Sequence, residues 1–162
     1  MNLVARTFAR EAFTRALSAD AFVRAMLDFE RALALAEGDV GVIPLDSARA
    51  IAKTCTDLSL SAETLAAESK RSGSLAVPLV KALTEHVARA DARAAAFVHH
   101  GSTSQDVLDT ALILCLAPCL ADADRVLAAA VNGMAGHARR HAGAVMLGRT
   151  LMQPATPITA GV

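Results

Sequence analysis

The sequence predicts an all-α protein, and three observations support this fold class. Hydrophobic residues make up 54% of the 162 residues and aromatic residues only 3%, so alanine and leucine must supply most of the packing. These two residues favour close-packed helices. From Val107 to Ala121 almost every residue is apolar, which is typical of a helix inside a bundle. Apart from the run Phe97–His99, no stretch has the alternating pattern of a strand.

The first clear helix is expected to follow Ser18 and to end at Gly41 and Pro44, because glycine and proline terminate helices. Its apolar residues recur at alternating steps of four and three, which predicts a single stripe facing the core. The members of this stripe are Phe22, Met26, Phe29, Leu33, Ala36 and Val40.

Three further helices are expected before residue 100. Asp46 is expected to cap one of them, and Ser61 to cap another that ends near Gly73. Pro78 suits the first turn of the next helix. The alanine-rich segment 90–96 either extends that helix or serves as a linker.

A long central helix is expected from Ser104 to about His141. Thr103 is a good N-cap. Asp106 stands three residues on, where its carboxylate can accept a hydrogen bond from the N-cap amide and complement the helix dipole. Residues 147–156 are expected to form a loop, and Pro157 to begin a further helix.

Charge and cysteine content exclude several classes of protein. Lys plus Arg and Asp plus Glu number 16 each, and without a basic stripe this balance argues against nucleic-acid binding. The apolar run from Ala111 to Ala117 is shorter than the ~20 residues that span a bilayer. Charges near the amino terminus argue against a secretory signal, and three cysteines without framework spacing suggest reduced thiols in a cytoplasm.

Two motifs resemble signature regions of the fumarase/aspartase superfamily. His99-x-Gly101-x-Thr103-Ser104-x-Asp106, followed by Asp109-Thr110-Ala111, is similar to the first, and Gly148-Arg149-Thr150-Leu151-Met152-Gln153 to the second. Met26–Ala34 and Val42–Pro44 resemble the family's amino-terminal helix and its exit turn. The resemblance implies an amino-terminal helical domain over residues 1–100 and the start of a central helical bundle over 101–162. The chain is therefore expected to be the front part of a longer polypeptide, without the family's later base-bearing loop.

The start of the central helix is the expected substrate site. Free amides at a helix amino terminus, flanked by hydroxyls, suit a small carboxylate, although the same residues also serve as plain caps. The resemblance implies a catalytic role for His99, and places Thr150 and Gln153 in the pocket of a neighbouring subunit. Gly73 and Ser72 either contribute to the site or merely end a helix. The catalytic candidates are His99 and Thr150; the substrate-binding candidates are Ser72, Gly73, Ser102, Thr103, Ser104, Gln105, Asp106, Arg149 and Gln153.

No metal or other cofactor is expected. His137 and His141 have the spacing of metal ligands, but Ala138 stands where a zincin motif requires glutamate, so a solvated helix face is expected. Cys115 and Cys119 share the apolar face of the central helix and are expected in the core.

Leu151 suggests which reaction of the superfamily applies. The family eliminates a group β to a carboxylate, or adds it, and the acid that protonates a leaving amine or alcohol is credited to a histidine at the position of Leu151. Losing such an acid costs roughly 10²–10⁴-fold. A carboxylate, with an acid pKa of about 4, leaves without a proton.

Gln105 and the run 72–80 also resemble the lactone-forming branch that acts on 3-carboxy-cis,cis-muconate in the protocatechuate pathway of aromatic-acid degradation. We therefore expect a cycloisomerase that binds a small carboxylate, assembled as a homotetramer with shared active sites. The alternatives are an adenylosuccinate-lyase-like enzyme and a non-catalytic helical oligomerisation module.

Overall fold

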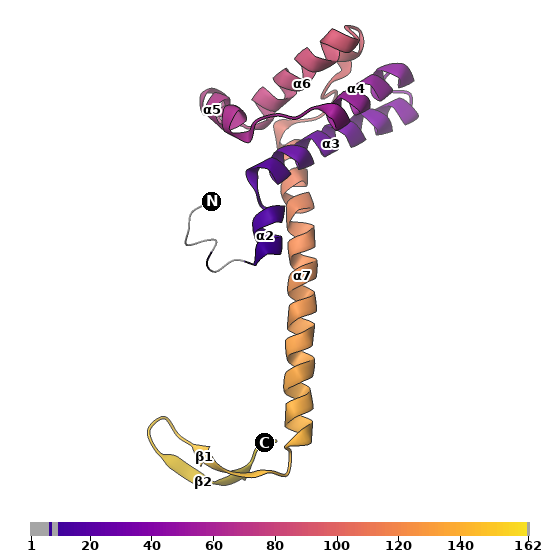
Figure 1. Cartoon of the computed structure of the whole chain (residues 1–162). Coiled ribbons are helices and arrows are strands. Elements are labelled where there is room, and N and C mark those ends of the chain that lie inside the picture. Colours follow the sequence, from indigo (N-terminus) through magenta and orange to yellow (C-terminus); the bar gives the residue numbers. More distant parts are fainter. Residues whose placement is uncertain (1–6, 8–9, 162) are drawn as a thin grey trace. The chain divides into compact units, whose positions relative to one another are not determined.

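The computed structural model describes residue 7 and residues 10–161 (Figure 1). The chain forms two compact units, residues 1–119 and residues 120–162. The division falls inside the longest helix, α7 (Ser104–Arg140), and not at residue 100. The assignment of residues 1–100 and 101–162 to two domains of a longer protein therefore stays a prediction. The all-α fold class is confirmed, with one small hairpin added to it.

The first unit is built from short helices packed around one apolar core. These are α2 (Glu11–Ala16), α3 (Ala19–Asp39), α4 (Leu45–Asp57), α5 (Ala62–Ser72), α6 (Ala76–Ala90), the 3-10 helix η1 (Ala94–Phe97) and the first part of α7. Helix α3 packs along α4, α4 contacts α6 and η1, and α6 contacts α5. The largest fully buried apolar side chains are Met26, Leu27, Ile51, Cys55, Leu79, Leu83, Val87 and Val107.

Two serine caps and one glycine confirm the predicted start of α3 and both predicted ends of α5. The Ser18 hydroxyl accepts a hydrogen bond from the Ala21 amide at 3.1 Å, and the Ser61 hydroxyl accepts one from the Thr64 amide at 3.3 Å. Helix α5 ends at Gly73, whose φ of +69° lies in the left-handed region that glycine tolerates best.

The prediction that Asp46 caps α4 is wrong, because α4 begins at Leu45 and follows Pro44. Asp46 lies inside the first turn, where its carboxylate complements the helix dipole. Helix α2 was not predicted. It is only six residues long and buries none of them, so it has no apolar stripe to reveal it.

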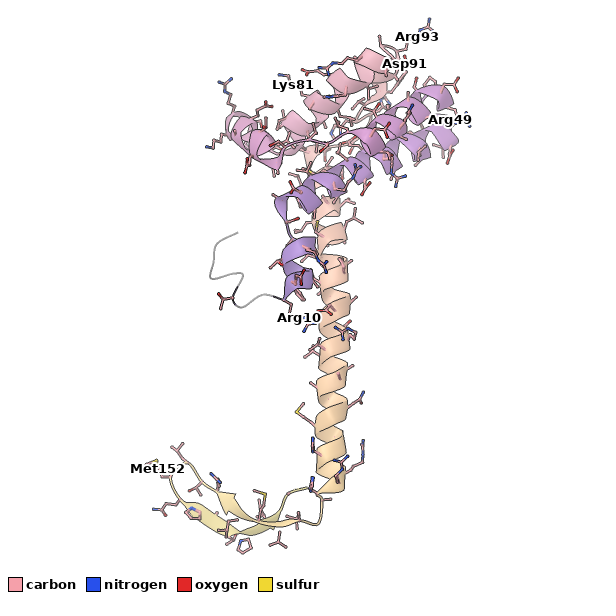
Figure 2. The ribbon with its side chains drawn as sticks, in the orientation of Figure 1. Arg10, Arg49, Lys81, Asp91, Arg93 and Met152 are labelled. Carbon is pink, nitrogen blue, oxygen red and sulfur yellow. The ribbon has the colours of Figure 1, made fainter. Side chains whose placement is uncertain are left out.

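Segment 90–96 ends one helix and starts another. Pro78 lies in the first turn of α6 as predicted, and α6 ends at Ala90. The Asp91 carboxylate then accepts hydrogen bonds from the amides of Arg93 and Ala94, at 2.8 and 3.2 Å, and so stabilises the turn between α6 and η1. Figure 2 labels Asp91 and Arg93 in this turn. Phe97–His99, the only strand-like run of the sequence, forms no strand: Phe97 ends η1, and Val98 and His99 belong to the turn that follows it.

The face that α3 buries differs from the predicted stripe. Of that stripe only Met26 is fully buried, whereas Val40 at the helix end is 75% exposed. The buried face is shifted by about one residue, because the side of the helix that packs against α4 is not the side that the stripe predicts. Its members are Val23, Ala25, Met26, Leu27, Glu30 and Ala34. A charged residue, Glu30, therefore lies in the middle of the buried face.

Helix α7 matches the predicted span of the central helix and continues through Pro118. Val107, Ala111, Cys115 and Cys119 form its buried side, so the prediction that both cysteines belong to the core is confirmed. Other apolar side chains of the predicted all-round apolar stretch are 45–63% exposed within this chain: Leu112, Ile113, Leu114 and Leu120.

The predicted loop and helix start after residue 147 are wrong. The second unit instead contains an antiparallel hairpin, β1 (Val145–Arg149) and β2 (Pro154–Thr159), in which Val145 pairs with Thr159 and Arg149 with Pro154. A bulge lies at Gly148, where an added Cβ would come within 3.0 Å of the Thr156 carbonyl oxygen. Two prolines and a glycine in so short a segment hide the strand pattern, and a two-stranded sheet tolerates them because both strands are edges.

Candidate active site

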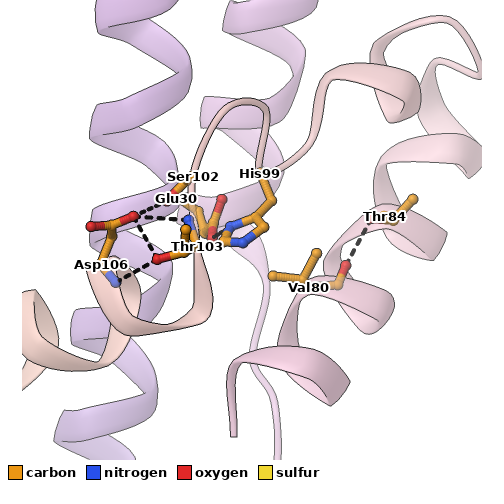
Figure 3. Close-up of polar contacts among 7 residues, drawn as sticks. All are labelled: Glu30, Val80, Thr84, His99, Ser102, Thr103 and Asp106. Atoms are coloured by element: carbon orange, nitrogen blue, oxygen red, sulfur yellow. Dashed lines mark hydrogen bonds and ion pairs between the residues drawn. The ribbon is translucent and has the colours of Figure 1, made fainter. Parts of the chain in front are cut away.

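The chain enters α7 through a turn formed by residues 98–103, called here the His99 turn (Figure 3). His99 has φ +59° and Gly101 has φ +64°, so both adopt the left-handed conformation. Glycine does this freely, but a non-glycine residue in that region is uncommon and often marks a functional site. The turn therefore holds the His99 side chain in a specific position at the start of the helix.

Thr103 and Asp106 form a reciprocal cap at the start of α7. The Asp106 carboxylate accepts hydrogen bonds from the Thr103 amide and the Thr103 hydroxyl, both at 2.8 Å, and the Asp106 amide donates to the Thr103 hydroxyl at 3.4 Å. These bonds from Thr103, followed by a weaker one from Ser102, hold the pKa of Asp106 below its usual range. The predicted cap is confirmed.

Of the three consecutive hydroxyls of this region, two share one partner and the third has none among the described residues. Those of Ser102 and Thr103 donate to Asp106, at 3.5 and 2.8 Å. The Ser104 hydroxyl and the amides of Ser104 and Gln105 form no hydrogen bond with the residues that the structure describes. These are the groups left to receive a carboxylate at the helix amino terminus.

Beneath the His99 turn, α3 contributes a buried carboxylate that sequence reasoning missed. Oε1 of Glu30 lies 2.7 Å from Nδ1 of His99 (Figure 3). The Glu30 side chain is 1% exposed and the His99 side chain 17%. The signal was present in the sequence, because Glu30 stands four residues after Met26 and four before Ala34, on the face that those residues bury.

The contact with Glu30 changes the proton affinity of His99. The hydrogen bond to Glu30 raises the pKa of His99, and the charges of Glu30 and Asp106 raise it further, against an opposing effect of burial. His99 therefore keeps its proton to a higher pH than a free histidine, and the protonated ring binds an anion well.

The remaining candidates of the first unit make local contacts. Gln105 is exposed and donates to the Asp109 carboxylate at 3.1 Å. The Ser72 hydroxyl donates to the Ser74 carbonyl at 2.9 Å, beside the left-handed Gly73. Within the described residues, neither Ser72 nor Gly73 forms a hydrogen bond with the His99 turn. Their observed contacts are those of a helix end.

The second motif forms the end of the hairpin, in the second unit. The Thr150 amide and hydroxyl both donate to the Gln153 carbonyl at 2.9 Å, and the Gln153 amide donates to the Thr150 hydroxyl at 3.1 Å. Arg149, the last residue of β1, is exposed. Leu151 and Met152 at the tip are 97% and 86% exposed (Figure 2). The backbone of this motif is thus fixed locally while its side chains face solvent.

The histidine pair on α7 is exposed, as expected of a solvated face. The rings of His137 and His141 stack with centroids 6.2 Å apart. Among residues 7 and 10–161, no cluster of three or more His, Cys, Asp and Glu side chains has the geometry of a metal site. In the same part of the chain, no helix is long and apolar enough to cross a bilayer.

A comparison with known families decides the family of the chain. A family model described as Lyase matches residues 4–162. The chain belongs to this lyase family. The resemblance of its motifs to the fumarase/aspartase superfamily is thereby confirmed.

The relatives of this chain are named for different activities. A 3-carboxy-cis,cis-muconate cycloisomerase of Bradyrhizobium diazoefficiens is 47% identical over 137 residues, which are 85% of this chain and 30% of that protein. A nitrosuccinate lyase of Streptomyces davaonensis is 40% identical over 151 residues, which are 91% of this chain and 31% of that protein.

A solved structure supports the same assignment. The 3-carboxy-cis,cis-muconate lactonizing enzyme of Pseudomonas putida has a TM-score of 0.89 and 36% identity, over 98% of this chain and 36% of its own. The chain thus spans about a third of the length of the relatives it matches, and corresponds to their amino-terminal part.

Proposed function

We propose that this chain is the amino-terminal part of a 3-carboxy-cis,cis-muconate cycloisomerase, which adds a carboxylate across a double bond in the protocatechuate branch of aromatic-acid breakdown. The single observation that carries this choice over the amine- and alcohol-eliminating members of the family is Leu151, which stands where the superfamily has its leaving-group acid. An amine or alcohol needs that proton to leave, and losing its donor costs roughly 10²–10⁴-fold. A carboxylate is a stable anion and does not need it.

The start of α7 binds one carboxylate of the substrate in this proposal. The Ser104 hydroxyl and the amides of Ser104 and Gln105 are the donors, because their hydrogen-bonding capacity is unused within the described chain. Thr103 and Asp106, with Ser102, fix the helix start that presents them. His99 adds a positive charge beside this group.

The second motif completes the pocket from a neighbouring subunit. Thr150 takes part in catalysis, and Arg149 and Gln153 bind substrate; their side chains belong to an exposed hairpin end that is available to another chain. Gly73 and Ser72 contribute from the end of α5. In the lactone-forming direction a carboxylate oxygen bonds to the β carbon while an acid protonates the α carbon. Donors already in place stabilise the carbanion-like charge at that carbon.

The acid or base that serves the α carbon lies outside these 162 residues. We therefore assign the activity to a polypeptide that carries this chain together with the remaining length found in its relatives, called here the long polypeptide. We expect the 162 residues alone to be inactive, because base and oxyanion donors must converge within hydrogen-bond distance.

Assembly as a homotetramer is part of the proposal. Leu112, Ile113 and Leu114 are 45–63% exposed on α7, and burying apolar surface contributes about 25 cal/mol per Å², a large term beside a domain's net stability. We place the protein in the cytoplasm, because Cys55, Cys115 and Cys119 are free and buried. A strictly monomeric long polypeptide in light scattering at micromolar concentration would contradict the shared active site.

A nitrosuccinate lyase is the second candidate, favoured by the 40% identity to a protein of that name. A nitro group leaves as nitrite, which is also a stable anion, so Leu151 is compatible with this reaction as well. The leaving-group argument therefore speaks against the elimination of an amine or alcohol. It does not distinguish the cycloisomerase from the nitrosuccinate lyase.

Parallel assays of the long polypeptide test the proposal. We expect turnover of 3-carboxy-cis,cis-muconate with a kcat/KM well above that for nitrosuccinate or adenylosuccinate. A preference for nitrosuccinate would establish the second candidate, and a preference for adenylosuccinate would contradict the argument from Leu151. No turnover of any of the three by a folded oligomer would favour a helical module without catalytic activity.

A further inference from the structure

The buried carboxylate of Glu30 has an unusual environment. It lies on the face of α3 that packs into the core, between Met26 and Ala34, with a side chain that is 1% exposed. Removing a carboxylate from water costs several kcal/mol unless a cation and hydrogen bonds compensate. A residue in such a place requires a specific partner.

The described chain offers Glu30 one partner. Oε1 contacts Nδ1 of His99 at 2.7 Å, and Oε2 is buried without a hydrogen bond. The arginines of the same helix are engaged elsewhere: Arg24 pairs with Asp28 at 3.2 Å and donates to the Cys55 carbonyl, and Arg31 pairs with Asp28 at 3.8 Å. Among the described residues, His99 is therefore the basic side chain in contact with Glu30 and the one placed to compensate its charge.

The other groups near this pair do not replace that charge. Burial raises the pKa of the neighbouring Cys55 thiol to about 12, so α4 contributes a neutral group. From α7 the charged group that acts on His99 is Asp106, which favours the imidazolium further. Both carboxylates thus stabilise the same protonated ring.

The geometry also determines which nitrogen of His99 faces a ligand. Because Glu30 occupies Nδ1, that nitrogen carries a proton directed at the carboxylate, and Nε2 is the nitrogen left to interact with another molecule. The left-handed backbone of His99, φ +59°, holds the ring over α3. The Glu30–His99 contact therefore fixes the orientation of the ring and favours a proton on Nδ1.

We propose that Glu30 is a positioning residue that holds His99 with Nε2–H directed at a carboxylate of the substrate. The inference rests on the proposed function for the membership of His99 in the active site. Glu30 itself does not contact the substrate, because it is buried beneath the His99 turn. A merely structural contact would fasten the His99 turn to α3 without controlling the charge of the ring.

NMR titration of the histidines in the long polypeptide tests this directly. In the unaltered protein we expect His99 to remain an imidazolium above the usual histidine pKa of about 6.5. In Glu30→Gln, which keeps the size and an oxygen acceptor, we expect the pKa of His99 to fall toward that value. The matched control is Glu37→Gln, since Glu37 is on α3 and faces Gly101 of the same turn but forms no hydrogen bond with His99.

Kinetics supply the second readout. With a hydrogen bond to a charged group lost or weakened, we expect Glu30→Gln to raise KM about 10-fold or more with a smaller change in kcat, and Glu37→Gln to leave both near the original values. We also expect the pH above which KM rises to move downward in Glu30→Gln.

Two results would overturn the role of Glu30. One is a pKa of His99 at or below about 6.5 in the unaltered protein. This measurement does not depend on the folding of any variant. The other is a folded Glu30→Gln protein with the original His99 titration and the original KM. Failure of the unaltered long polypeptide to turn over 3-carboxy-cis,cis-muconate would instead contradict the proposed function, so the two failures are distinguishable.

Discussion

The His99 turn and the hairpin carry the two signature motifs, and they obtain their geometry in different ways. The His99 turn is fixed from below by Glu30, 2.7 Å away on α3, and from the side by the Thr103–Asp106 cap. The hairpin relies on its own ladder and on the Thr150–Gln153 turn, and its tip residue Leu151 is 97% exposed. The first motif is thus organised by the packed fold of one chain, whereas the second is held by its own backbone hydrogen bonds and has exposed side chains.

The largest effect should come from the His99 turn. In the long polypeptide we expect His99→Asn to lower kcat/KM roughly 10²–10⁴-fold, the range for loss of a group that moves a proton or binds a reacting anion. Asparagine tolerates the left-handed backbone of this position, so the turn should persist. The control is His100→Asn, next in sequence and exposed. Equal losses in both variants would show that the turn, and not His99, matters.

The next largest difference between the His99 turn and the hairpin should appear in the free energy of unfolding. Leu83 is fully buried in the core that supports the His99 turn, whereas Leu151 is 97% exposed. We expect Leu83→Ala to lower the free energy of unfolding by about 2–5 kcal/mol and Leu151→Ala to change it by less than ~0.5 kcal/mol. Urea unfolding of the 162-residue chain measures both. A comparable loss from Leu151→Ala would mean that the hairpin packs within one chain.

Two hydroxyls at the start of α7 should have different roles, that of Ser104 in substrate binding and that of Thr103 in folding. Ser104 has no partner among the described residues, so Ser104→Ala in the long polypeptide should cost about 1.5–3 kcal/mol of substrate binding and little stability. Thr103→Ala removes a cap and should cost about 0.5–2 kcal/mol of stability. Michaelis kinetics and thermal unfolding of both variants measure the two effects. If Ser104→Ala changed only stability, the region would be a cap without a ligand.

A smaller effect should appear in the pH dependence of stability. Glu30 raises the pKa of His99 in the folded chain, so the resulting stabilisation is complete below the unfolded value of about 6.5 and is lost as pH rises through the folded pKa. We expect the free energy of unfolding of the 162-residue chain to decrease over that interval. His99→Asn should remove the slope; an identical slope in this variant would assign it to other groups.

The parts that were predictable from the sequence depended on local signals. Ser18, Ser61 and Gly73 predicted helix ends correctly because a cap acts within one turn, and Thr103 with Asp106 did the same for α7. The motif spacing also led to the correct family.

Interactions between distant segments were not predictable in this way. Glu30 and His99 stand 69 residues apart, and the apolar pattern of α3 pointed to a neighbouring face of the helix. The hairpin was missed because Gly148, Pro154 and Pro157 obscure a pairing that the ladder between the strands stabilises.

The most direct test of the proposed reaction is Leu151→His in the long polypeptide. If the leaving group is a carboxylate, the new histidine supplies a proton that the reaction does not use, and lactone formation from 3-carboxy-cis,cis-muconate should fall or change by less than a few-fold. The side chain is 97% exposed in this chain, so the substitution should not disturb folding. A large gain in kcat/KM, or the appearance of efficient adenylosuccinate cleavage in Leu151→His, would contradict the proposed function.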